Sequence, residues 1–179
     1  PQEIDAVVLT HAHLDHTGLL PRLVAQGYGG PIYCTRPTRP LAGLVLEDAG
    51  SLQEEEARFA QKKGYSRHAD PRPLFTRRDA LQAMKLLEPL PFAHEREIFP
   101  GITIRYVRAG HLLGAASIEI AAKSSLGGHQ RWLFSGDVGR YDAPILRDPE
   151  PPSATPDALV LESTYGDRDH PDENPGPLL

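Results

Sequence analysis

The segment from His11 to His16 places three imidazoles and one carboxylate within six residues. His11 and His13 are two positions apart, so on an extended backbone their side chains point the same way and can reach one cation. Asp15 and His16 lie beyond an expected reversal of the chain and can face a second cation. Imidazole nitrogens suit zinc, and a carboxylate oxygen suits zinc, manganese or iron. The segment therefore predicts the two-metal site of a hydrolase.

Three more polar residues each come shortly after an expected strand: His111, Asp137 and Glu162. The strands that precede them are expected at 102–107, 132–134 and 158–161, and the last of these is expected to be buried. Glycines lie near all three, and a glycine lets the backbone turn and approach other groups where larger residues resist. Because these residues lie downstream of the histidine cluster and at strand ends, they are candidate metal ligands or catalytic groups.

The elements that must position these residues follow from the hydrophobic pattern. Further strands are expected at 4–10, 31–34 and 117–121, with a hairpin turn at Gly127-Gly128 before the strand near 132. Helices are expected at 18–26, 38–63 and 77–88. Thr17 and Thr76 are expected to cap the first and third helices, and Pro89 to follow the third; the second is either one helix or two broken near Gly50. Helices before residue 88 and strands after residue 98 predict a layered α/β fold, with helices covering an outer face of a sheet.

Length and composition limit the class of protein to which the chain can belong. A chain of 179 residues can bury one substantial core, which predicts one domain, and it contains no apolar run long enough for a membrane span. Cys34 is the single cysteine, so no disulfide can form within the chain and a reducing cytoplasm is expected. Cys34 itself is expected to be a small buried residue at the end of the strand at 31–34. The net charge of −5 gives no overall basic surface for nucleic acid, although bound metal ions would reverse the field locally. The chain starts at Pro1 without a methionine and ends soon after a motif, so a fragment of a longer protein is expected.

The order of these motifs resembles that of the metallo-β-lactamase superfamily, and more narrowly that of the RNA-processing branch of the β-CASP nucleases. The histidine cluster, His111 and Asp137 match the wider superfamily. The stretch Glu162-Ser163-Thr164-Tyr165-Gly166 is similar to the β-CASP acidic motif. The helical stretch before Pro71, followed by Pro73-Leu74-Phe75-Thr76 and its helix, is similar to the β-CASP RNA nucleases and cleavage-factor homologues. The resemblance spans nearly the whole chain. It implies an incomplete αββα sandwich over 1–165, with strands expected before Pro1 and with 166–179 beginning a connection to a β-CASP domain that the chain does not contain.

The resemblance also implies the roles of the site residues. The implied ligands are His11, His13 and His111 for a first zinc, Asp15 and His16 for a second, and Asp137 as a bridge between the two. The implied catalytic residues are Asp15, which orients the nucleophile, Asp137, and Glu162, which orients a histidine that lies outside this chain. Two Zn²⁺ ions are expected, with Mn²⁺ as an alternative. Two later histidine motifs of the family are absent, so the fragment by itself is expected to be nearly inactive.

The leading hypothesis is a metal-dependent hydrolase that cleaves phosphodiester bonds of single-stranded RNA with a hydroxide held between two zinc ions. One alternative is a non-catalytic RNA-binding subunit of a processing complex. Another keeps the fold and changes the substrate to a thioester, a lactam or DNA, with a DNA-acting β-CASP nuclease as the nearest competitor. Fold alone does not decide the substrate.

Overall fold

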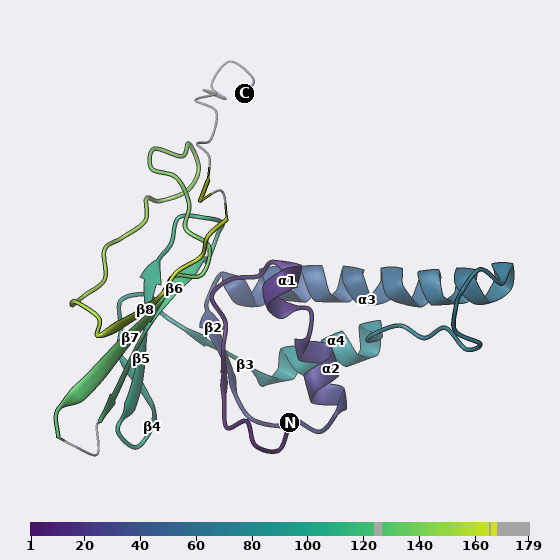
Figure 1. The fold of residues 1–179 in the computed structure, drawn as a ribbon, viewed down its shortest axis with the longest axis horizontal. Coiled ribbons are helices and arrows are strands. Elements are labelled where there is room, and N and C mark those ends of the chain that lie inside the picture. Colours follow the sequence, from purple (N-terminus) through teal and green to yellow (C-terminus); the bar gives the residue numbers. More distant parts are fainter. Residues whose placement is uncertain (124–126, 165, 168–179) are drawn as a thin grey trace.

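The computed structural model describes residues 1–123, 127–164 and 166–167. Two β-sheets lie in this structure, and the helices gather beside one of them (Figure 1). The element order is α/β in the first half and almost all strand in the second, as the sequence predicts. No helix in the described ranges is both long and apolar enough to cross a membrane. Apart from Gly166 and Asp167, the expected connecting segment 166–179 lies outside the described residues.

The first sheet has three parallel strands in the order β1 (Val7–Val8), β2 (Ile32–Thr35) and β3 (Leu87–Leu90). Helical segments connect these strands. They are α1 (Leu14–Thr17), α2 (Leu20–Ala25), α3 (Thr38–Lys63), α4 (Arg77–Ala83) and a 3-10 turn η1 (Met84–Leu86). Every residue of β2 is buried, because Ile32 and Cys34 pack toward the helices and Tyr33 packs toward the second sheet. The expected burial of Cys34 is confirmed.

The second sheet has five strands in sequence order: β4 (Arg96–Phe99), β5 (Ile102–Arg108), β6 (Ala116–Lys123), β7 (His129–Phe134) and β8 (Ala158–Val160). Neighbours are antiparallel except for β7 and β8, which run parallel. Ile104, Tyr106 and Ile118 form the core between the sheets together with Tyr33. Gly127 and Gly128 both have positive φ, as a turn before β7 requires, while residues 124–126 lie outside the described residues.

The helix boundaries follow from local chemistry. A reciprocal capping box starts α4: the Thr76 hydroxyl accepts from the Asp79 amide, and the Asp79 carboxylate accepts from the Thr76 amide. Helix α3 is a single helix that ends at Gly64, which adopts the left-handed conformation with φ 67°. Gly50 does not break α3. A Cβ there would lie 2.7 Å from the Arg77 backbone nitrogen, so this glycine allows α4 to approach α3 closely.

Four expectations about the elements were wrong. The helix expected over 77–88 stops at Ala83, because Leu87–Leu90 pairs with β2 and Pro89 is tolerated on a strand that pairs on one side only in the described part of the sheet. Thr17 does not cap a helix; it ends α1, and its hydroxyl donates to the His13 carbonyl at 2.9 Å. The strand expected over 4–10 shortens to Val7–Val8. Strand β8, expected to be buried, leaves Leu159 53% and Val160 54% exposed.

Candidate metal centre

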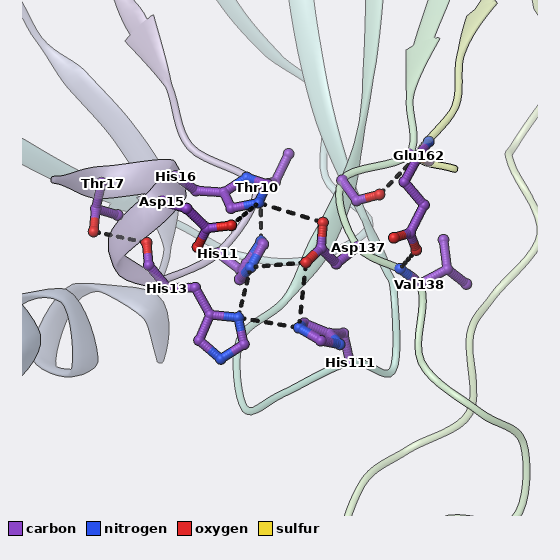
Figure 2. A network of polar contacts seen from close by, with 12 residues as sticks. Thr10, His11, His13, Asp15, His16, Thr17, His111, Asp137, Val138 and Glu162 are labelled. Atoms are coloured by element: carbon purple, nitrogen blue, oxygen red, sulfur yellow. Dashed lines mark hydrogen bonds and ion pairs between the residues drawn. The ribbon is translucent and has the colours of Figure 1, made fainter. Parts of the chain in front are cut away.

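The candidate metal centre lies where loops from the two sheets meet (Figure 2). His11 and His13 follow β1 of the first sheet, and Asp15 and His16 lie in α1. His111 lies in the loop between β5 and β6, and Asp137 follows β7. Residues about a hundred positions apart in sequence thus come together as the strand-end pattern predicts.

Three imidazoles and one carboxylate form a first group around a common point. Nδ1 of His13 lies 3.1 Å from Nε2 of His11 and 3.1 Å from Nε2 of His111. Oδ2 of Asp137 lies 3.6 Å from the His11 nitrogen and 3.5 Å from the His111 nitrogen. These four donor atoms all lie within 4.8 Å of one another. Three ring nitrogens and one carboxylate oxygen that face a common point are a donor set that suits a divalent cation.

A second, smaller group lies on the other side of Asp137. Nε2 of His16 is 3.3 Å from Oδ1 of Asp137 and 3.5 Å from Oδ2 of Asp15. The two oxygens of Asp137 therefore face different groups, Oδ2 toward the three histidines and Oδ1 toward His16. The Asp15 side chain is 77% exposed, so this second group is the more open of the two.

His11 is the buried member of the cluster, with a fully inaccessible side chain. Burial, followed by the positive charge that His16 can carry, lowers the pKa of His11 from 6.5 to about 4. The ring is therefore neutral at ordinary pH, and its nitrogen is available to a metal. Thr10 Oγ1 lies 3.0 Å from Nδ1 of His11; with the proton on Nδ1, this contact aims the Nε2 lone pair at the cluster.

Thr10 also joins the loops of the two sheets. Its carbonyl accepts a hydrogen bond from the Ala116 amide at 2.9 Å, which fastens the start of β6 to the histidine segment. Gly136 packs against the same threonine so closely that a Cβ would lie 2.7 Å from the Thr10 Cβ. The residue that precedes Asp137 must therefore be small. The threonine before His11 thus sets the spacing between the first and third ligand loops.

Two buried threonines hold the loop of His111. The hydroxyls of Thr35 and Thr38 donate to the Gly114 carbonyl at 2.7 and 3.0 Å. Gly114 has φ +89°, and a Cβ there would lie 2.6 Å from the Thr38 backbone nitrogen. Since neither threonine is exposed, the end of β2 and the start of α3 form a rigid support for this loop.

Glu162 lies beside the cluster and does not contact its histidines. Its Oε1 accepts a hydrogen bond from the Val138 amide at 2.5 Å, and its own amide donates to Ser135 Oγ at 3.0 Å (Figure 2). Glu162 and Ser135 therefore hold both ends of the turn that carries Asp137. The histidine that Glu162 is expected to orient is outside this chain, and that role stays a prediction.

The six expected ligand residues all gather at this site. The supporting residues Thr10, Thr35, Thr38 and Ser135 were not predicted, because a lone threonine or serine has no distinctive spacing. The position of Thr10 immediately before His11 is the one signal that could have pointed to it. A cleft of about 330 Å³ opens next to the cluster and is lined by His111, Asp137, Arg140 and Glu162 among others.

The chain is similar in sequence to known proteins. The sequence profile of the metallo-beta-lactamase superfamily matches residues 1–172. A ribonuclease of Thermus thermophilus is 37% identical over 171 residues, which are 95% of this chain and 34% of the relative. A protein named transcription termination factor FttA, from Cenarchaeum symbiosum, is 35% identical over 92% of this chain and 23% of its own length. The chain thus spans about a third or less of these relatives.

A solved structure of a B3 metallo-beta-lactamase with an active-site glutamic acid is also similar. It is 18% identical, with a TM-score of 0.45 over 80% of this chain and 48% of that chain.

Proposed function

The chain belongs to the metallo-β-lactamase superfamily, and from this premise we propose that it forms part of a β-CASP-type hydrolase that cleaves phosphodiester bonds in RNA. The arrangement of Asp137 carries the proposal, because its two carboxylate oxygens face two separate groups of nitrogen and oxygen donors. The choice of RNA rests on the relatives, one named a ribonuclease and another a transcription termination factor. A DNA substrate would need the same cluster, so the experiment must compare both.

We assign His11, His13 and His111 to a first divalent cation, His16 and Asp15 to a second, and Asp137 to both. Imidazole nitrogens dominate the set, which favours zinc, and the exposed carboxylate of Asp15 is also compatible with manganese. When bound, such ions supply Lewis acidity that activates water and offsets negative charge on a phosphoryl group. Because burial keeps His11 neutral, the chain offers this nitrogen without first releasing a proton above about pH 4.

Two acidic residues of the site also hold other groups in place. Asp15 reaches His16 from the exposed side, where it orients that ring and the approaching nucleophile. Glu162 accepts the Val138 amide proton and so fixes the turn that presents Asp137. We therefore assign Glu162 first to positioning Asp137, while its expected histidine partner would come from chain beyond this segment.

The convergence of the six candidate ligands argues against the alternative of a non-catalytic RNA-binding subunit, because such subunits lack ligands. The test is the Asp137→Ala variant of the full-length protein, assayed with one oligoribonucleotide and its matched oligodeoxyribonucleotide. Asp137 is the ligand assigned to both metal ions. Its loss should lower RNA cleavage by more than about 100-fold and reduce the bound metal measured by elemental analysis.

Asp70→Ala is the matched control, because Asp70 is an exposed acid in the loop after α3 that pairs with Arg72. It should leave cleavage and metal content unchanged. Normal RNA cleavage by Asp137→Ala would overturn the proposal, and faster cleavage of the deoxyribonucleotide by the unmodified protein would assign the site to DNA.

A further inference from the structure

Two adjoining clefts run from the candidate metal centre along the loop that follows Asp137. The first, of about 330 Å³, includes His111 and Asp137 in its walls. The second, of about 200 Å³, includes Phe92, Arg108 and Arg147. Gly110 and Leu146 line both clefts, so the two adjoin, and we call them together the path from the metal ligands.

One arginine in each cleft forms no ion pair with any described residue. Arg140 lines the first cleft and Arg147 the second, and neither takes part in an ion pair or hydrogen bond with any described residue. The third arginine on the path, Arg108, is already engaged by Glu150 at 3.1 Å and by the face of Phe92 at 4.3 Å.

Four acidic residues in or beside the two clefts have other partners. Glu150 pairs with Arg108, and Asp148 accepts the Asp142 amide at 2.8 Å. In the first cleft Asp137 faces the histidines and Glu162 accepts the Val138 amide. Arg140 and Arg147 thus present positive charge beside the candidate metal centre, in a chain whose net charge is −5, and such guanidinium groups suit the oxygens of a phosphate.

The loop that carries the two arginines is fastened at both ends to the backbone just before His111. At one end the Gly139 amide donates to the Ala109 carbonyl at 2.7 Å, and a Cβ on Gly139 would lie 1.9 Å from the Gly110 oxygen. At the other end the Glu150 amide donates to the Arg108 carbonyl at 2.9 Å. The path therefore keeps a constant position relative to the metal ligands, as a subsite for a substrate requires.

We propose that Arg140 and Arg147 bind backbone phosphates of single-stranded RNA on one side of the bond that is cleaved. Exposed Leu113 and Ile145, near the second cleft, offer apolar surface to the unpaired bases. This inference rests on the proposed function, since it takes the scissile phosphate to lie at the metal centre. It adds a phosphate-binding path that reads charge and spacing and is indifferent to base sequence.

The test measures binding of a cleavage-resistant phosphorothioate oligoribonucleotide to the full-length protein, by fluorescence anisotropy over a series of KCl concentrations. Each phosphate contact on a single strand contributes about −0.7 to the slope of log affinity against log salt. Arg140→Ala and Arg147→Ala should each make the slope shallower by about 0.7, and the double variant by about 1.4. Arg140→Lys keeps the charge and should retain most of the slope.

Arg78→Ala is the matched control, because Arg78 is an exposed arginine on α4 and lines neither cleft. It should keep the original slope. The loss of RNA affinity in the arginine variants should also be equal for uridine-rich and adenine-rich oligonucleotides. Unchanged slopes in both alanine variants would overturn the path while leaving the proposed function intact. Failure of the unmodified protein to bind RNA at all would overturn the proposed function, and this inference with it.

Discussion

The two sheets contribute to the candidate metal centre in different ways. The three-stranded sheet is buried on both faces at β2 and supplies four of the six candidate ligands from one short stretch, His11 to His16. The five-stranded sheet ends in the exposed strand β8 and supplies His111 and Asp137 from separate loops. One half offers a local group of donors on a rigid support. The other half completes the group only when its loops are correctly placed, so the junction between the sheets decides whether the site exists.

Separating the two ligand loops of the five-stranded sheet should have the largest effect. In Gly139→Ala the new methyl group would overlap the Gly110 carbonyl, 1.9 Å away, and push the Asp137 loop from the His111 loop. We expect a loss of about 4 kcal/mol or more in the free energy of unfolding, and loss of metal binding. Urea unfolding and elemental analysis measure the two effects. Gly29→Ala is the control, because no atom lies within 4 Å of its Cβ position; equal stability of the two variants would contradict the prediction.

Replacing one leucine by alanine in each half should measure how differently the two sheets are packed. Leu46 is fully buried between α3 and the first sheet, so Leu46→Ala should cost about 3 kcal/mol of unfolding free energy. Leu159 on β8 is 53% exposed, and Leu159→Ala should cost less than about 1 kcal/mol. Urea unfolding followed by circular dichroism gives both values. Similar losses at the two positions would show that β8 is buried in the full-length protein.

Acid should weaken the junction through His11. Between pH 6.5 and about 4 the unfolded chain binds a proton that the buried ring excludes, so the free energy of unfolding should fall as the pH falls through this range. The contribution is fully present above pH 6.5, and its loss is at most about 3 kcal/mol by pH 4. Urea unfolding of the metal-free protein at several pH values measures it. His11→Gln should remove this part of the pH dependence, and His68→Gln, at an exposed loop position, should not.

A small effect is also expected at the support of the His111 loop. Thr35→Val keeps the shape of the side chain and removes one of the two hydrogen bonds to the Gly114 carbonyl. The free energy of unfolding should fall by about 1 kcal/mol, and metal affinity by about tenfold. Thr35→Ser, which keeps the hydroxyl, should restore metal affinity in a competition titration with a chelator. A weakened serine variant would show that the methyl group, rather than the hydrogen bond, supports the loop.

The parts of the molecule that could be predicted from sequence are those with local signals. The cluster from His11 to His16 is visible because its spacing is unusual, and the Thr76 cap is visible because Asp79 follows three residues later. Strand β3 was missed because Leu87–Leu90 continues a helical pattern and becomes a strand only by pairing with β2. The exposure of β8 was also missed, because an apolar run does not indicate what packs against it.

The supports of the site could not be read from sequence for a related reason. Thr35 and Gly114 are 79 positions apart in sequence, and neither residue type nor local spacing predicts their contact. The same holds for Gly139 and Gly110, whose close approach depends on how two loops leave two different strands. Local chemistry identified which residues could bind a metal, while long-range packing determines how they are held.

The hydrogen bond between the Thr10 carbonyl and the Ala116 amide has a consequence for how ligand binding and folding are linked. It closes a loop of more than a hundred residues, and the entropic cost of that closure is offset only by the contacts formed when the two sheets dock. An ion bound by groups from both sheets would act as a reversible cross-link across the same boundary. It would stabilise the docked arrangement by RT ln(1 + [metal]/Kd). Free metal concentration would then set how tightly the two halves of this domain are coupled.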